Sequence, residues 1–135
     1  MNVSDGARRR LLGCVLPVLV LAGCGDGASC LDLAREYQAA MPDAMVCDPT
    51  EVGSCDAGRP LIVSKQDAGG KVTLEGLCQC LGAVNPERTA RLDALLARYD
   101  GAGCTRLACF CPPPELHAAS CTSAGKCTGI WSLGE

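Results

Sequence analysis

The sequence predicts a small disulfide-rich α+β domain. Three observations support this fold class: 12 cysteines among 135 residues, two stretches with apolar residues at helical spacing, and short β-prone runs separated by turn residues. Cysteine at this density is typical of a short domain that is cross-linked in an oxidising compartment. The chain has only four aromatic residues, so we expect the disulfides to supply much of the stability that a larger apolar core would give.

Residues 31–46 are expected to form the first helix. Its apolar stripe follows the spacing i, i+4, i+8, i+11 and comprises Leu33, Tyr37, Met41 and Ala44. Ser29 fits the N-cap, and Asp32 would lie at the positive end of the helix dipole. Because proline lacks an amide hydrogen, Pro42 predicts a kink or an early end of this helix.

The middle of the chain predicts a loop and then a β-hairpin. Residues 48–60 are rich in Asp, Gly and Pro and read as loop. The apolar run 61–63 and the run 71–74 have strong β propensity and flank the pair Gly69-Gly70. Two β-prone runs around a glycine turn predict an antiparallel hairpin.

A second helix is predicted from its start signal and its apolar stripe. Asn85 is a fitting N-cap, Pro86 suits the first helical position, and Glu87 follows in the first turn. The stripe comprises Leu92, Leu95, Leu96 and Tyr99. Gly101 and Gly103 mark the end.

The C-terminal third predicts two further β elements. Residues 107–111 read as a short strand that three prolines, 112–114, bring to an end. Within 118–131, residues 123–126 lie between two cysteines and favour a second hairpin.

The N-terminus is typical of an export signal. Arg8–Arg10 precede an apolar run, Leu11–Leu21, which is too short to span a bilayer but has the length of a signal-peptide core. The motif Leu21-Ala22-Gly23-Cys24 resembles the lipobox of bacterial lipoproteins. The resemblance implies cleavage before Cys24 and acylation of its thiol; a plain export signal cut elsewhere is the alternative.

This resemblance implies an organisation and a location. Residues 1–23 would be the signal peptide, 24–29 the lipidated cysteine and a short tether, and 30–135 the disulfide-rich domain. The membrane would be a partner through the lipid, and the expected location is the bacterial cell envelope. Asp26 does not follow Cys24 directly, so we favour the outer over the inner membrane.

The cysteine count supports the same division. Cys14 would leave with the signal and Cys24 would carry the lipid, so an even number remains for five disulfides. These ten are Cys30, Cys47, Cys55, Cys78, Cys80, Cys104, Cys109, Cys111, Cys121 and Cys127. Their connectivity stays open among roughly 945 pairings. The Cys-x-Cys pairs 78/80 and 109/111 would share a strand face, too far apart for an unstrained bridge within each pair, so distant partners are expected.

Other chemistries have weaker support in the sequence. Zinc sites favour wider cysteine spacings, and neither Cys-x-Cys pair stands at a helix N-terminus, where a redox thiolate would be stabilised. His117 is the one histidine and the only candidate base for a hydrolase. The mature chain would carry 9 basic and 14 acidic residues, which argues against nucleic-acid binding. We therefore expect no cofactor, no metal and no enzymatic activity, with a hydrolase using His117 as one alternative.

Several short elements resemble small cysteine-rich lipoproteins of myxobacteria, which are largely uncharacterised. The matching elements are residues 37–41, Cys47, 84–86, 92–95, 103–104 and 109–111. The resemblance implies an envelope location and a compact α+β disulfide domain, and it assigns no catalytic residue. The expected function is a lipid-anchored binding or structural module, with another envelope protein as its candidate partner. The alternative is an inhibitor or effector of an extracellular enzyme that presents residues 53–60 or the region around Pro112.

Overall fold

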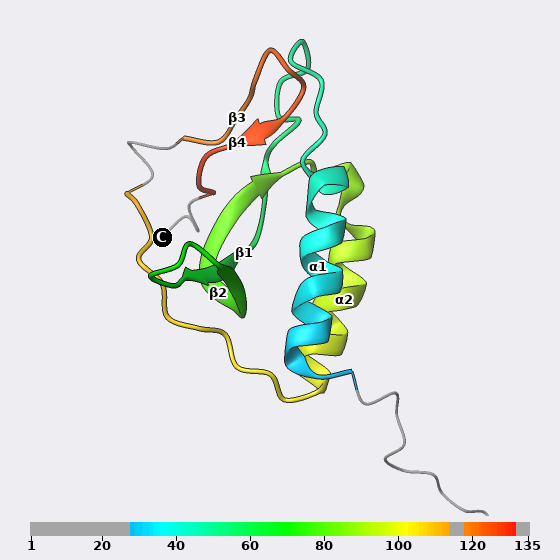
Figure 1. The fold of residues 1–135 in the computed structure, drawn as a ribbon. Helices are drawn as coiled ribbons and strands as arrows, with labels where there is room; N and C mark the ends of the chain where they lie inside the picture. The colour runs from blue at the N-terminus through cyan, green and yellow to red at the C-terminus, as the bar shows by residue number, and fades with distance from the viewer. Residues whose placement is uncertain (1–27, 114–117, 132–135) are drawn as a thin grey trace, which may run out of the picture.

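The computed structural model describes residues 28–113 and 118–131 of the chain. Its elements, in chain order, are α1 (Cys30–Ala44), β1 (Ala57–Gln66), β2 (Val72–Val84), the 3-10 helix η1 (Pro86–Arg88), α2 (Ala90–Gly101), β3 (Ser120–Cys121) and β4 (Cys127–Thr128). The two α-helices lie side by side along one side of the β1–β2 hairpin, and the small β3–β4 sheet lies near its upper end (Figure 1). With five disulfides, this confirms the predicted disulfide-rich α+β fold.

Helix α1 begins and ends for the reasons expected. The Ser29 hydroxyl accepts from the Asp32 amide, and the Asp32 carboxylate accepts from the Ser29 amide, which completes a capping box. The Ser29 hydroxyl and the Ser29 amide both donate to the Asp32 carboxylate, and these two hydrogen bonds hold the pKa of Asp32 below its usual value. Pro42 lies in the last turn, and the helix ends at Ala44, two residues before the predicted boundary.

The predicted hairpin is confirmed, but its strands are much longer than expected. Residues 57–60, predicted as loop, pair with the end of β2, from Ala57 opposite Val84 to Pro60 opposite Leu81. The local composition misled the prediction because strand pairing with a distant segment overrides weak propensity. Pro60 is accommodated where the register shifts, at an irregularity of the ladder.

The second helix starts later than predicted. The Asn85 side chain accepts from the Glu87 amide, but it caps the 3-10 turn η1 and not the α-helix. Helix α2 begins only at Ala90, after Thr89, whose side chain makes no cap hydrogen bond. Gly103 follows the helix with φ +75°, as its predicted role at the end requires.

The predicted strand 107–111 is wrong, whereas the second hairpin is confirmed. Leu107 makes a single parallel bridge beside Cys78 on β2, and the segment then leaves the sheet. Disulfides replace the ladder here, as described below. β3 and β4 pair as a short antiparallel hairpin, with Gly125 in its turn at φ +73°.

The core fills the space between the helices and β2. The stripe predicted for the first helix is buried, and so are Leu92, Leu95 and Tyr99 of α2. Tyr37 is fully buried and its hydroxyl donates to the Pro60 carbonyl at 2.9 Å, which ties α1 to β1. Among the described residues, no helix combines the length and apolar character needed to cross a membrane.

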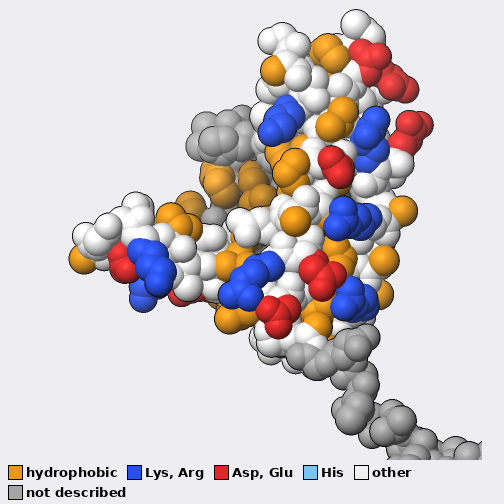
Figure 2. Space-filling view, turned by 45° about the vertical axis from the view of Figure 1, so that its right-hand side comes forward, with side chains coloured by type: hydrophobic (Ala, Val, Ile, Leu, Met, Phe, Trp, Pro, Cys, Tyr) orange, Lys and Arg blue, Asp and Glu red, His pale blue; other side chains and the backbone are white. Residues whose placement is uncertain are grey.

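Charges of both signs alternate over the helical surface. Figure 2 shows Lys and Arg side chains interspersed with Asp and Glu on this face. One ion pair joins β1 to α2, with Arg59 Nε 2.6 Å from Asp93, and another joins the helices, with Arg98 3.0 Å from Glu36. This face therefore has no broad single-sign field of the kind that attracts a polyanion.

Candidate functional site

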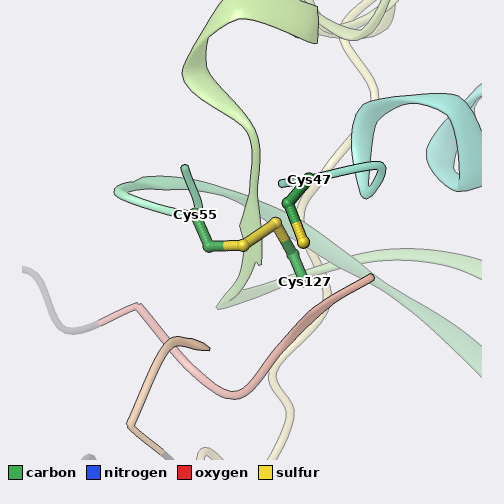
Figure 3. Close-up of side chains that lie close together, drawn as sticks. All are labelled: Cys47, Cys55 and Cys127. Atoms are coloured by element: carbon green, nitrogen blue, oxygen red, sulfur yellow. A yellow bond between two sulfur atoms is a disulfide. The ribbon is translucent and has the colours of Figure 1, made fainter. Parts of the chain in front are cut away.

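Two disulfides meet at the upper end of the molecule and form what we name the inner sulfur cluster. Cys47 pairs with Cys121, and Cys55 pairs with Cys127. The sulfurs of Cys47, Cys55 and Cys127 lie within 4.8 Å of one another, and all three residues are buried (Figure 3). These bonds join the loop between α1 and β1 to the β3–β4 hairpin, two segments far apart in the sequence.

Two further disulfides form the outer sulfur cluster. Cys78 pairs with Cys109 and Cys80 with Cys111, so the two Cys-x-Cys pairs bind each other. This confirms that each cysteine has a distant partner. Cys78 and Cys80 are buried on β2, whereas Cys109 is half-buried and Cys111 is exposed. The Sγ atoms of Cys80 and Cys109, which belong to different disulfides, are 2.9 Å apart.

The fifth disulfide, Cys30–Cys104, joins the first turn of α1 to the loop after α2. All ten predicted cysteines are therefore cross-linked. Three sulfurs in each cluster are close enough to hold one metal ion, but zinc binds thiolates, and these sulfurs are bonded to one another. Metal binding at either cluster would first require reduction.

A tripeptide held by the outer cluster carries the most exposed aromatic side chain among the described residues. Phe110 is 91% exposed and lies between Cys109 and Cys111, each of which is bonded to β2. Upstream, the backbone is fixed by two hydrogen bonds between Leu107 and β2. We name residues 109–111 the clamped tripeptide.

The loop 48–56 is a second rigid projection. The Asp48 carboxylate accepts from the amide and the hydroxyl of Thr50, and these bonds lower its pKa. The Ser54 hydroxyl donates to the Asp48 carbonyl. Val52, fully exposed, lies in this loop. Of the predicted presenting segment 53–60, residues 57–60 belong to β1, so only its first part is loop.

An apolar groove of about 430 Å³ separates the C-terminal turns of α1 from the β-hairpin and β4. Its walls are largely aliphatic and include Met41, Met45, Leu61 and Ile62. Gly82 shapes its floor, because a Cβ at this position would lie 2.5 Å from the Leu61 side chain. The groove offers contact to an apolar group and no ionisable side chain.

Two of the residues that the sequence analysis singles out lie outside the part of the chain that the structure describes. These are Cys24, the expected lipidation site, and His117, the candidate base. Trp131, at the end of the described C-terminal segment, packs on Gly58, where an added Cβ would meet its ring at 2.6 Å. Buried Tyr37 has a raised pKa because its surroundings cannot solvate the phenolate.

Sequence reasoning missed the pairing of the two Cys-x-Cys elements and the exposure of Phe110. One signal pointed to the pairing: the two elements have identical internal spacing, so two disulfides of equal span, 31 residues, can join them side by side. Phe110 lies in the segment 107–111, which the sequence predicts to be a short strand. Apolar character alone does not reveal that flanking disulfides hold a side chain outward.

The chain matches no protein-family model, and comparisons with curated proteins and with solved structures give no significant match.

Proposed function

We propose that the chain is a lipid-anchored bacterial envelope protein whose rigid domain is a non-enzymatic binding module. The observation that carries the binding role is Phe110, a 91% exposed phenyl ring on a backbone that two disulfides fix to a buried strand. Its partner would be another envelope protein.

The energetics favour a binding role for this ring. Burying a phenylalanine side chain is worth roughly 1.5–3 kcal/mol, a gain that Phe110 forgoes in the isolated domain. Aromatic side chains supply many of the strongest contacts in protein interfaces. Because the clamped tripeptide is already ordered, a partner that buries the ring loses little conformational entropy on binding.

The lipid anchor is proposed from the lipobox-like residues before Cys24. Disulfides are compatible with this location because they persist in oxidising compartments. Five residues separate Cys24 from Cys30, so the six extended steps between them span about 20 Å at most. The N-terminal end of α1 would therefore lie close to the membrane surface. We keep the outer membrane as the proposed location.

The anchor is tested by the intact mass of the protein extracted from membranes of a bacterial host. The expected chain begins at Cys24, carries acyl groups and has no free thiol. A chain that begins at Met1 would refute the export proposal.

The binding role is tested by site-specific crosslinking in intact cells. A photoreactive phenylalanine analogue at position 110 should capture a discrete envelope protein. The matched control carries the analogue at Val52, which is equally exposed but lies in the loop 48–56. Equal capture from both positions, or none from position 110, would refute the assignment of Phe110 as the anchor.

The same tripeptide supports the alternative function. The region around Pro112 was one of two expected presenting segments for an inhibitor, and Phe110 lies two residues before it. If the captured partner is a secreted hydrolase, purified protein should lower its activity, and Phe110→Ala should abolish this effect. Capture of a protein without catalytic activity favours the binding module.

A further inference from the structure

The outer sulfur cluster is graded in exposure. Cys111 is exposed and Cys109 half-buried, whereas their partners Cys80 and Cys78 are only 3% and 2% exposed. Solvent therefore reaches Cys111 most readily and Cys109 in part, whereas the two cysteines on β2 are covered. In the inner sulfur cluster, by contrast, the most accessible cysteine is only half-buried, and three are buried.

The row of sulfurs is continuous across the two disulfides. Cys80 Sγ and Cys109 Sγ belong to different disulfides and lie side by side. The sulfurs of Cys78, Cys80 and Cys109 all lie within 4.8 Å of one another. A thiolate formed at Cys80 thus has a disulfide sulfur directly beside it, which is the arrangement that thiol–disulfide exchange needs.

We propose that the outer sulfur cluster reacts with an external monothiol at Cys111 and transfers the opened bond inward to Cys78. This activity does not depend on the proposed binding role. The product retains one disulfide in the cluster, Cys80–Cys109, and that pairing is absent from the oxidised domain.

The exchange takes place in three steps. The external thiolate attacks Cys111 Sγ, so a mixed disulfide forms and the Cys80–Cys111 bond breaks, with the electron pair leaving on Cys80. The Cys80 thiolate attacks Cys109, so the Cys80–Cys109 bond forms and the Cys78–Cys109 bond breaks. A second external thiolate attacks the external sulfur of the mixed disulfide and releases Cys111 as a thiolate.

The three steps together consume two external thiols. They are oxidised to one external disulfide, one protein disulfide is reduced, and the two protons that they lose end on Cys78 and Cys111. Cys78 and Cys80 are almost equally buried, so burial favours neither free thiol over the other, and the two pairings should interconvert.

The rearrangement loosens the clamped tripeptide. In the oxidised domain, Cys109 and Cys111 are both bonded to β2. After the exchange only Cys109 is bonded, to Cys80, and Cys111 carries a free thiol. Reduction by one disulfide equivalent would therefore leave Phe110 beside a single bond to β2.

The test is limited reduction of the purified, fully oxidised domain with 2-mercaptoethanol, followed by acid quenching, alkylation with N-ethylmaleimide and peptide sequencing by mass spectrometry. Within the outer sulfur cluster, the first two-electron product should carry label at Cys111, and label at Cys78 should accompany label at Cys80, with the Cys80–Cys109 bond in the fraction labelled at Cys78. Label at Cys80 and none at Cys78 would overturn the proposal. Reaction first in the inner sulfur cluster would also overturn it.

A variant tests the inner step without added thiol. In Cys111→Ser, Cys80 is free beside the remaining disulfide, so label should be found at Cys78 as well as at Cys80. The matched control is Cys104→Ser, which frees Cys30 from the isolated fifth disulfide and should be labelled at Cys30 alone. Label confined to Cys80 in Cys111→Ser would refute the transfer, and label spread over the inner sulfur cluster would refute its confinement to the outer one.

Discussion

Replacing Cys30 and Cys104 together by alanine should destabilise the domain by about 4 kcal/mol, chiefly through the unfolded state. The disulfide closes a segment of 74 residues. In the chain that keeps the other four bonds, the shortest covalent path between these positions runs through Cys47–Cys121 and covers about 34 residues. Chain-entropy arithmetic gives about 4.5 kcal/mol for the longer path and about 3.8 kcal/mol for the shorter one.

Removing this disulfide tests the entropy of the unfolded chain with little change in core packing. Cys30 is exposed, and Cys104 lies at the margin of the core with 9% exposure, so alanine leaves little empty space. Denaturation by guanidinium chloride, followed by circular dichroism, should show the loss of stability together with a steeper dependence on denaturant, since the unfolded chain expands. A loss below about 1 kcal/mol with an unchanged slope would refute the entropic account.

A second double variant serves as the comparison. Cys55 and Cys127 also lie far apart in the sequence, but the path through Cys47–Cys121 joins them over only about 14 residues, which reduces the entropic part to about 3 kcal/mol. Cys127 is completely buried, so alanine there also removes packing. The stability loss should be similar to that of the first variant, with a smaller change in slope.

Three further substitutions test individual contacts. Tyr37→Phe removes the hydrogen bond to the Pro60 carbonyl and should cost about 1–2 kcal/mol in denaturant titration, with the near-ultraviolet spectrum as a check on folding. Leu92→Ala empties a fully buried site and should cost about 2–5 kcal/mol; a smaller loss would contradict its place in the core. Hydrogen bonding from Arg59 lowers the pKa of Asp93, so this pair stabilises the fold above about pH 4 and less as pH falls through the lowered pKa. Asp93→Asn should therefore flatten the acid side of a midpoint-against-pH curve; an unchanged curve would contradict the assignment.

Features with local causes could be predicted from the sequence. The apolar stripe containing Leu33 and Tyr37 identifies the first helix because a helix repeats its faces every 3.6 residues. Ser29 and Asp32 identify its start, because a capping box involves neighbouring residues only. The hairpin followed from two β-prone runs and a glycine turn, which are again neighbours in the chain.

Features with distant causes could not be predicted in the same way. Strand β2 contains Gly76 and Gly82, which weaken a strand signal, and its second half is held in place by residues 57–60 and by Leu107. Cysteine identity does not specify which of many partners a thiol will meet, because the fold brings them together. Phe110 is exposed for the same reason: its position depends on bonds to residues about 30 positions away.

The order of the disulfides along the chain has a consequence for its synthesis. The first five cross-linked cysteines, from Cys30 to Cys80, all pair with the last five, from Cys104 to Cys127. Because the ribosome builds the N-terminus first, no native bond can close until Cys104 has been made. Five thiols must wait together, and any bond among them is wrong. Efficient maturation therefore depends on delayed oxidation or on a catalyst that reshuffles early bonds.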